Sequence, residues 1–223
     1  MTELVLRNKE IIKKLDYVKD TVYSSKAMDS EYVKSKLIYH KGFDEDKLQE
    51  YLGEDYLYKH MNDLEHKGFP VEHRSFPVGH GIKDCSKLKE VKEYGQHDFV
   101  NELGATSDAV FLFYPPGGFV GWHNNANNSG HQFIFTHSTT GNGYFQYYDQ
   151  TKKDIIVTKD QPGWRVHHHH FGKEDKDHCW HSAYAGENRI TMCVLFRWWD
   201  RLEKKDQIIE MKDLLIEEIE SED

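Results

Sequence analysis

Two stretches of the chain carry side chains that could bind a metal ion together. His123 and Asn125 stand two residues apart in the first stretch, and His181 lies in the second, followed by Arg189 and Thr191. Alternate residues of a strand point to the same face, so each closely spaced pair shares a face where its stretch is extended. Imidazoles and one oxygen ligand can hold a first-row metal and leave coordination positions open. A guanidinium beside a hydroxyl suits the carboxylate of a bound acid, because its planar fork matches a carboxylate bidentately.

Each of these residues also has an ordinary structural interpretation. A single histidine on a strand is most often a satisfied or surface residue, and a loop asparagine such as Asn125 most often caps a turn. Arg189 could form a buried ion pair, although a lone charge at the start of an apolar strand is costly and favours a bound anion. Thr191 is equally suited to a strand as a β-branched residue.

Four blocks, in this order, resemble the iron(II)/2-oxoglutarate-dependent oxygenases. They are WHNNANNSG at 122–130, YFQYYD at 144–149, GWRV at 163–166, and the pair WH at 180–181 with NRIT at 188–191. The resemblance is narrowest to small oxygenases encoded by bacteriophages, cyanophages especially. It covers roughly the C-terminal half of the chain, and the N-terminal half carries no motif that we can place.

The resemblance implies a hydroxylase that uses iron(II), 2-oxoglutarate and dioxygen on an unidentified substrate, either a protein side chain or a small metabolite. The implied metal ligands are His123, Asn125 and His181. The residues predicted to bind the co-substrate are Arg189, Thr191, Gln132 and Tyr147. The predicted catalytic residues are His123, His181 and Arg189.

Asn125 is a departure from the family pattern, which places a carboxylate two residues after the first histidine. A neutral amide oxygen is a poorer ligand for iron(II) than a carboxylate. The metal is then held by two histidines and solvent, or Asn125 coordinates weakly, or the site has lost catalysis. Some members, the aspartyl/asparaginyl β-hydroxylases among them, work without that carboxylate, so catalytic activity is a prediction here and not a deduction.

Other histidines compete for the metal role. The run from His167 to His170 would send two imidazoles to each face of a strand, so its members cannot converge on one ion, although the inward pair could line the pocket or carry protons. His178 competes with His181 for the second ligand position, but the Trp180-His181 pairing fits the resemblance better. Further candidates are His131 and His137.

The totals describe a globular chain of 223 residues, with 38% hydrophobic, 13% aromatic and 30% charged residues, for which one compact domain is expected. The net charge of -9 disfavours nucleic acid and anionic lipid as partners. Three dispersed cysteines and the absence of a signal-peptide pattern predict a reducing cytoplasm, that of the host if the protein is phage-encoded. They are Cys85, Cys179 and Cys193, the last two expected in the core or a pocket wall. No apolar run approaches the roughly 20 residues that span a bilayer.

Helical periodicity flanks a β-rich region. Apolar residues recur at helical spacing in Thr2–Val22, Asp44–His66, Ser86–Leu103, where Gly95 weakens the middle, and Asp200–Asp223. The segment Phe69–Lys83 is expected to be extended. We therefore predict a helical N-terminal part at 1–107, a β-rich core at 108–199 and a C-terminal helix at 200–223.

The β-rich core divides into eight short runs of β-branched and aromatic residues separated by turn residues, as an antiparallel jelly roll or barrel requires. The runs are Val110–Tyr114, Phe119–Asn125, His131–Ser138, Tyr144–Asp149, Ile155–Lys159, Trp164–Phe171, Trp180–Tyr184 and Arg189–Trp199. Eight strands is also the count of the double-stranded β-helix of the oxygenases. Two other functions stay open: a non-catalytic jelly-roll binding module, and a histidine-rich cupin enzyme that uses residues such as His131 without 2-oxoglutarate.

Overall fold

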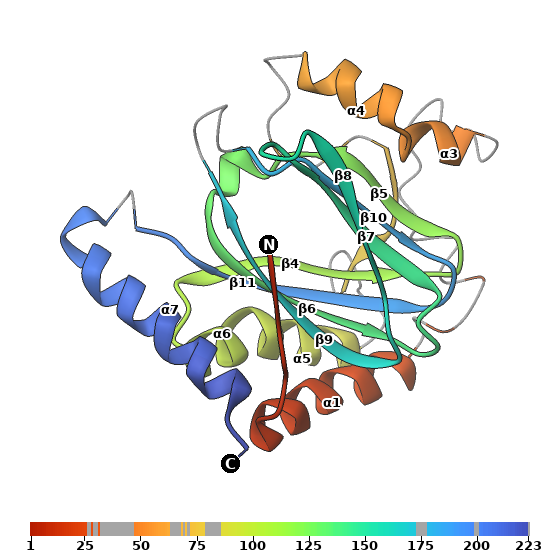
Figure 1. The fold of residues 1–223 in the computed structure, drawn as a ribbon. Helices are drawn as coiled ribbons and strands as arrows, with labels where there is room; N and C mark the ends of the chain where they lie inside the picture. The colour runs from red at the N-terminus through yellow and green to blue at the C-terminus, as the bar shows by residue number, and fades with distance from the viewer. Residues whose placement is uncertain are drawn as a thin grey trace.

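The computed structural model describes residues 1–25, 28, 31, 47–62, 68, 70, 72–78, 86–172, 178–198 and 201–222, except for the side chain of Asn127. Cys85, Trp199 and the outer residues of two predicted helices, 44–46 with 63–66 and 200 with 223, lie outside the described residues. Two β-sheets form the centre of the molecule, and helices cover their outer faces (Figure 1).

Eight strands build a jelly roll. They are β4 (Ser107–Tyr114), β5 (Gly118–His123), β6 (Gly130–Ser138), β7 (Gly143–Asp149), β8 (Asp154–Lys159), β9 (Gly163–Phe171), β10 (His181–Ala185) and β11 (Arg189–Phe196). The first pairs antiparallel with the last, β5 with β10, β6 with β9 and β7 with β8. This nested pairing is that of a long hairpin rolled into two sheets. The predicted fold class, mainly β with flanking helices, is confirmed.

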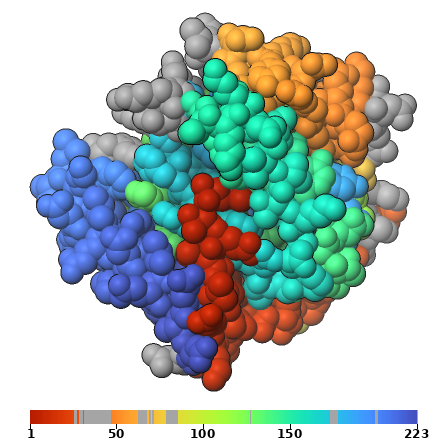
Figure 2. All heavy atoms as spheres, viewed as in Figure 1, coloured from red at the N-terminus to blue at the C-terminus, as the bar shows by residue number. Residues whose placement is uncertain are grey.

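Three short strands extend the two sheets. β1 (Thr2–Leu4) pairs with β9, β2 (His73–Arg74) with β5, and β3 (Phe76–Pro77) with β4. The six-stranded sheet has the order β1-β9-β6-β11-β4-β3, and the five-stranded sheet has the order β2-β5-β10-β7-β8. Figure 2 shows the N-terminal segment, in red, on the surface between the C-terminal helix and the barrel strands.

The prediction of a helix from Thr2 is wrong for the first residues of the chain. Helix α1 spans Lys9–Tyr23, and Asn8 caps it, because its Oδ1 accepts a hydrogen bond of 2.9 Å from the Ile11 N–H. A cap satisfies an amide at the helix start that has no partner within the helix. Ahead of this cap, pairing with β9 makes Thr2–Leu4 a strand despite the helical spacing of its apolar residues.

The second predicted helix is two helices, α3 (Leu48–Tyr51) and α4 (Glu54–Met61), with Gly53 as the N-cap of the second. At the break the Leu52 carbonyl accepts hydrogen bonds from the Trp122 indole (2.9 Å) and the Gln146 amide (2.8 Å). Both helices lie over the five-stranded sheet, where they share a core with Phe119, Trp122 and Trp180 (Figure 1). The break thus fixes this layer to the strand that ends at His123.

The third predicted helix begins as expected but contains a wider turn. α5 (Ser86–Glu93) continues through the π-helical turn η3 (Tyr94–Asp98) into α6 (Phe99–Glu102). A Cβ on Gly95 would lie 2.9 Å from the Phe111 ring, so this turn packs against β4 only with glycine there. After a short 3-10 turn, η6 (Leu202–Lys204), the chain ends in α7 (Lys205–Glu220).

Helices α1, α5, α6 and α7 cover the outer face of the six-stranded sheet (Figure 1). Strand alternation sends Phe133 and Phe135 of β6 toward this layer, and sends Ile134 between the two sheets. The inner faces of the two sheets therefore enclose a second, smaller core. Within the described residues no helix is long and apolar enough to cross a membrane.

Candidate metal and co-substrate site

His123 and His181 face each other between the sheets. His123 is the last residue of β5, His181 is the first of β10, and the two are directly paired across these strands. Their ring centroids are 4.0 Å apart, and each residue is only 5% exposed. Two strand ends thus bring together imidazoles that are almost sixty positions apart in the sequence.

Backbone carbonyls fix the proton of both imidazoles. The Nδ1 of His123 lies 2.8 Å from the Gly121 carbonyl oxygen, and the Nδ1 of His181 lies 2.8 Å from that of Cys179. A carbonyl oxygen only accepts, so each Nδ1 carries the hydrogen and each Nε2 keeps its lone pair. Burial lowers the pKa of His181 to about 4, so its ring is neutral at pH 7. A second ring nitrogen anchored in this way is the usual arrangement of a metal-binding histidine.

Strand alternation predicted that Asn125 lies on the same strand as His123. That prediction is wrong, because β5 ends at His123. Asn125 begins the 3-10 turn η4 (Ala126–Asn128) but makes no side-chain capping hydrogen bond. Its Nδ2 lies 3.4 Å from the free Nε2 of His181. Rotation about the terminal torsion of the carboxamide exchanges its nitrogen and oxygen, so the oxygen can be presented at the same place.

Arg189 lies at the other end of the site and has a carboxylate partner within the chain. Its Nε donates to Oδ2 of Asp160 over 2.9 Å, its Nη2 to Oδ1 over 3.4 Å, and its Nη1 to Thr191 Oγ1 over 2.9 Å. The arginine and aspartate side chains are 3% and 7% exposed. The guanidinium also stands over the Tyr114 ring, 5.3 Å from its centroid. Arg189 therefore forms the buried ion pair that the sequence left open as the alternative to a bound anion.

One cavity of about 50 Å³ joins the two ends of the site. The predicted site residues that line it are His123, Asn125, Gln132, His181, Arg189 and Thr191. The polar lining residues that the sequence did not single out are Tyr114 and Ser182. Tyr114 closes the first strand run, but nothing in the sequence placed its phenol beside Arg189 and Thr191, where burial raises its pKa and the guanidinium opposes this.

Gln132 lines this cavity, and Tyr147 does not. The Gln132 amide donates to the Asn128 carbonyl over 2.8 Å and accepts from the Cys193 thiol over 3.2 Å, so it supports the wall. Tyr147 is paired across the strands with His181 but is not among the residues that line the cavity. Its predicted contact with the co-substrate stays a prediction.

The four-histidine run alternates across β9 as expected. His167 and His169 point between the sheets, are 7% and 2% exposed, and each has a buried Nε2 with no hydrogen-bond partner. His168 points to the helix-covered face, where its Nε2 lies 2.9 Å from Nδ1 of His131. Neither pair lines the cavity. The His131 ring is thus on the opposite face of the sheet from His181.

The remaining competitors also lie outside the cavity. The Nδ1 of His178 lies 3.4 Å from the Asn124 amide, and that of His137 lies 3.1 Å from the Tyr23 hydroxyl. Cys193 lines the cavity wall, and burial raises the pKa of the Cys179 thiol to about 12, so both are inert pocket or core thiols. Among the histidines of the described ranges, the pair across β5 and β10 alone lines this cavity.

The donor set fits a metal with two imidazoles and a neutral oxygen. No group of three or more His, Cys, Asp and Glu side chains in the described part of the chain is placed to hold a metal ion. Among the described lining residues the metal donors are the imidazoles of His123 and His181 and the Asn125 carboxamide, and solvent or a chelating acid would have to fill the other positions. The fit is that of a weak site for a first-row metal.

Asn125→Asp is expected to raise the affinity for iron(II) by at least about tenfold, because it adds a charged ligand beside the Nε2 of His181. Anaerobic calorimetric titration measures this change. Asn128→Asp adds the same charge in the same turn, at a position that does not line the cavity, and should leave the affinity as it is. An equal effect of the two substitutions would exclude Asn125 from the metal site.

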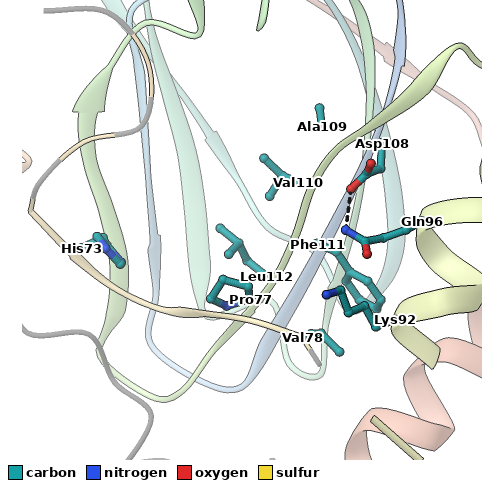
Figure 3. Close-up of a pocket in the computed structure, with 10 residues that line it drawn as sticks. All are labelled: His73, Pro77, Val78, Lys92, Gln96, Asp108, Ala109, Val110, Phe111 and Leu112. Carbon is teal, nitrogen blue, oxygen red and sulfur yellow. Dashed lines mark hydrogen bonds between the residues drawn. The ribbon is translucent and has the colours of Figure 1, made fainter. Parts of the chain in front are cut away.

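A larger cavity of about 320 Å³ lies beside the small one, against β4. Five consecutive β4 residues, 108–112, line it, together with Lys92 and Gln96 from the helical layer. Figure 3 shows Val110 and Leu112 on the side of β4 away from the helical segment that carries Lys92 and Gln96. On the other side Gln96 donates a hydrogen bond of 2.9 Å to Asp108, drawn as a dashed line. Val110 and Leu112 line both cavities, so the two chambers share a wall.

No family model matches the chain, and no curated protein matches it. A Pseudomonas putida prolyl-4-hydroxylase is 14% identical with a TM-score of 0.35, and the match covers 82% of this chain and 98% of that chain. A Burkholderia pseudomallei oxidoreductase of the 2OG-Fe(II) oxygenase family is 12% identical with a TM-score of 0.36, and covers 87% and 94%. Drosophila melanogaster CENP-C bound to CAL1 is 9% identical with a TM-score of 0.28.

The match to CENP-C covers 38% of this chain and 61% of that one, so the chain spans less than two thirds of its length. Solved structures similar to this chain thus include 2OG-Fe(II) oxygenases at low identity. All three TM-scores are below 0.5. The jelly-roll fold is therefore supported by the nested strand pairing, and the candidate site is supported by the distances between its side chains.

Proposed function

We propose that the protein is an iron(II)- and 2-oxoglutarate-dependent oxygenase that hydroxylates its substrate. The observation that supports this proposal most strongly is a single cavity with two carbonyl-anchored imidazoles at one end and a guanidinium at the other. An acid that chelates a metal through one end and extends a carboxylate from the other needs metal ligands at one end of its cavity and a cation at the other. The narrower resemblance to small phage oxygenases stays a prediction.

In this proposal His123 and His181 hold iron(II) through Nε2, and the Asn125 oxygen or solvent completes the protein side. When bound, iron and 2-oxoglutarate would supply the oxidising chemistry, with dioxygen as the oxidant. Arg189 and Thr191 would bind the far carboxylate of the co-substrate, and Tyr114 could donate its hydroxyl there. The protein contributes orientation, and its buried cavity excludes water.

The cavity between the sheets is small for a five-carbon diacid. Ligand pockets commonly measure about 300–1,000 Å³, against about 50 Å³ here, so co-substrate binding must displace side chains of the wall. The neighbouring chamber of about 320 Å³ falls in that range and would hold the prime substrate, next to the shared wall of Val110 and Leu112. A protein side chain and a small metabolite both remain possible occupants.

A non-catalytic binding module is the second candidate, because Asp160 already neutralises Arg189 and no Asp or Glu of the described residues lines the cavity with the two histidines. The cupin alternative gains no further histidine in this cavity from the described residues, since the His131 ring faces the helices. Metal and co-substrate binding separate the oxygenase from the binding module, because a module that has lost its chemistry needs neither.

Anaerobic addition of iron(II) and then 2-oxoglutarate is expected to produce a weak visible charge-transfer band. Arg189→Gln should keep iron binding but weaken 2-oxoglutarate binding by about tenfold to a hundredfold, because a charged hydrogen-bonded contact contributes ~1.5–3 kcal/mol. Arg197→Gln removes an arginine beyond the end of the same strand and serves as the control. Binding of neither iron nor 2-oxoglutarate to the unaltered protein would leave only the binding module.

A further inference from the structure

Neighbouring backbone holds Asp160 in place beside Arg189. The backbone N–H of Asp160 donates to the Gly143 carbonyl over 2.9 Å, which fixes the loop after β8 against the start of β7. A Cβ on Gly143 would lie 2.5 Å from Oδ2 of Asp160, so the carboxylate occupies space that only glycine leaves open. The position of the carboxylate on the guanidinium is therefore specified by the chain around it.

The ion pair uses one edge of the guanidinium, and on the other edge only Nη1 has a partner, because it donates one hydrogen to Thr191 Oγ1. Asp160 takes the edge formed by Nε and Nη2, and it is not among the residues that line the cavity, whereas Arg189 and Thr191 are. A guanidinium has a second edge, formed by Nη1 and Nη2, that can also receive a carboxylate. A bound diacid would thus meet a cation whose charge is already compensated.

Two opposed effects follow from this arrangement. The carboxylate orients Arg189, which favours ligand binding, and its negative charge repels a second carboxylate on the same guanidinium, which opposes it. The repulsion would be strong because the Asp160 side chain is only 7% exposed and its charge is poorly screened by solvent. An asparagine at position 160 would keep an oxygen acceptor for the Nε–H of Arg189 and remove only the negative charge. In that variant Arg189 keeps most of its orientation, and the repulsion of the ligand carboxylate is lost.

We propose that Asp160 is an internal counter-ion that takes the place of the co-substrate's far carboxylate on Arg189 in the empty protein and thereby limits its affinity for diacids. This inference rests on the proposed function of the cavity. It explains how a buried arginine is tolerated without a ligand, since an unpaired buried charge is strongly destabilising. Asp160 is a residue that acts through Arg189 and sets the selectivity of the site.

The test compares two 2-oxo acids that differ in the far carboxylate, 2-oxoglutarate and 2-oxovalerate, by anaerobic calorimetry in the presence of iron(II). The ratio of their affinities measures recognition of that carboxylate. Asp160→Asn is expected to raise the ratio by about tenfold over the unaltered protein. It should also lower the melting temperature of the empty protein and increase the stabilisation that 2-oxoglutarate gives.

Asp154→Asn makes the same change of charge at an exposed position in β8 and should leave the ratio unchanged. Asp160→Ser, a smaller uncharged acceptor, provides the same comparison if the asparagine variant does not fold. In Asp160→Asn combined with Arg189→Gln the gain should disappear. A ratio that stays equal or falls in both single variants overturns the counter-ion, whereas an unaltered protein that binds neither acid overturns the proposed function and this inference with it.

Discussion

His181→Ala is expected to weaken iron(II) binding by more than about 100-fold, because it removes one of the two proposed imidazole ligands from a cavity whose described lining residues include no carboxylate. The Nδ1 of His181 donates its hydrogen to the Cys179 carbonyl, so the lone pair of this ring is on Nε2. Bound iron(II) would stabilise the native protein by an amount that grows with the logarithm of its affinity, so the rise in melting temperature expected on adding iron should largely disappear in this variant.

The histidine that competed for this role in the sequence supplies the matched control. His178 is buried three positions earlier, beside Asn124 and outside the cavity, so His178→Ala should keep iron binding. Circular dichroism of both variants without metal separates lost binding from lost folding, since His181 also packs against Phe145 and Phe171. Retained binding in His181→Ala together with lost binding in His178→Ala would transfer the ligand role to His178.

The protein is expected to lose stability steeply as the pH falls from about 6.5 toward 4. Burial lowers the pKa of His167 to about 4 and that of His169 well below its ordinary value. In the unfolded chain both rings titrate near 6.5, so below that pH the unfolded state binds more protons and gains population. His167 alone would remove ~3 kcal/mol over this window.

Denaturant unfolding at pH 7.5, 6.5 and 5.5 measures this loss. In His167→Gln the fall between pH 6.5 and 5.5 should be smaller than in the unaltered protein, whereas His97→Gln at an exposed position should change nothing. Carboxylates such as Glu187, whose pKa hydrogen bonds lower, add their own loss only at more acidic pH. A flat stability between pH 7.5 and 5.5 would show that the buried imidazoles are already charged or accessible to water.

Local pattern was sufficient for the barrel strands and insufficient for some helix boundaries. Short β-rich runs between turn residues indicated all eight strands, because β-branched and aromatic residues suit a pleated, buried surface and turn residues end each run. The boundary at Thr2–Leu4 was wrong because β9 offers a free edge that overrides local helical spacing. The break at Gly53 depends on Trp122 and Gln146, whose donors reach the Leu52 carbonyl from distant strands.

The sequence by itself determined which chemical groups the site can contain: two imidazoles next to strand ends, an arginine and a threonine on one face of an apolar strand, and an amide in place of a carboxylate. Strand alternation follows from backbone geometry alone, so it also determined which of the four consecutive histidines share a face. Tertiary structure decided everything that depends on proximity across the sheets. It alone set Asp160 on Arg189, brought the Asn125 amide to the Nε2 of His181, and turned His131 toward the helices, because these contacts join segments that no local spacing relates.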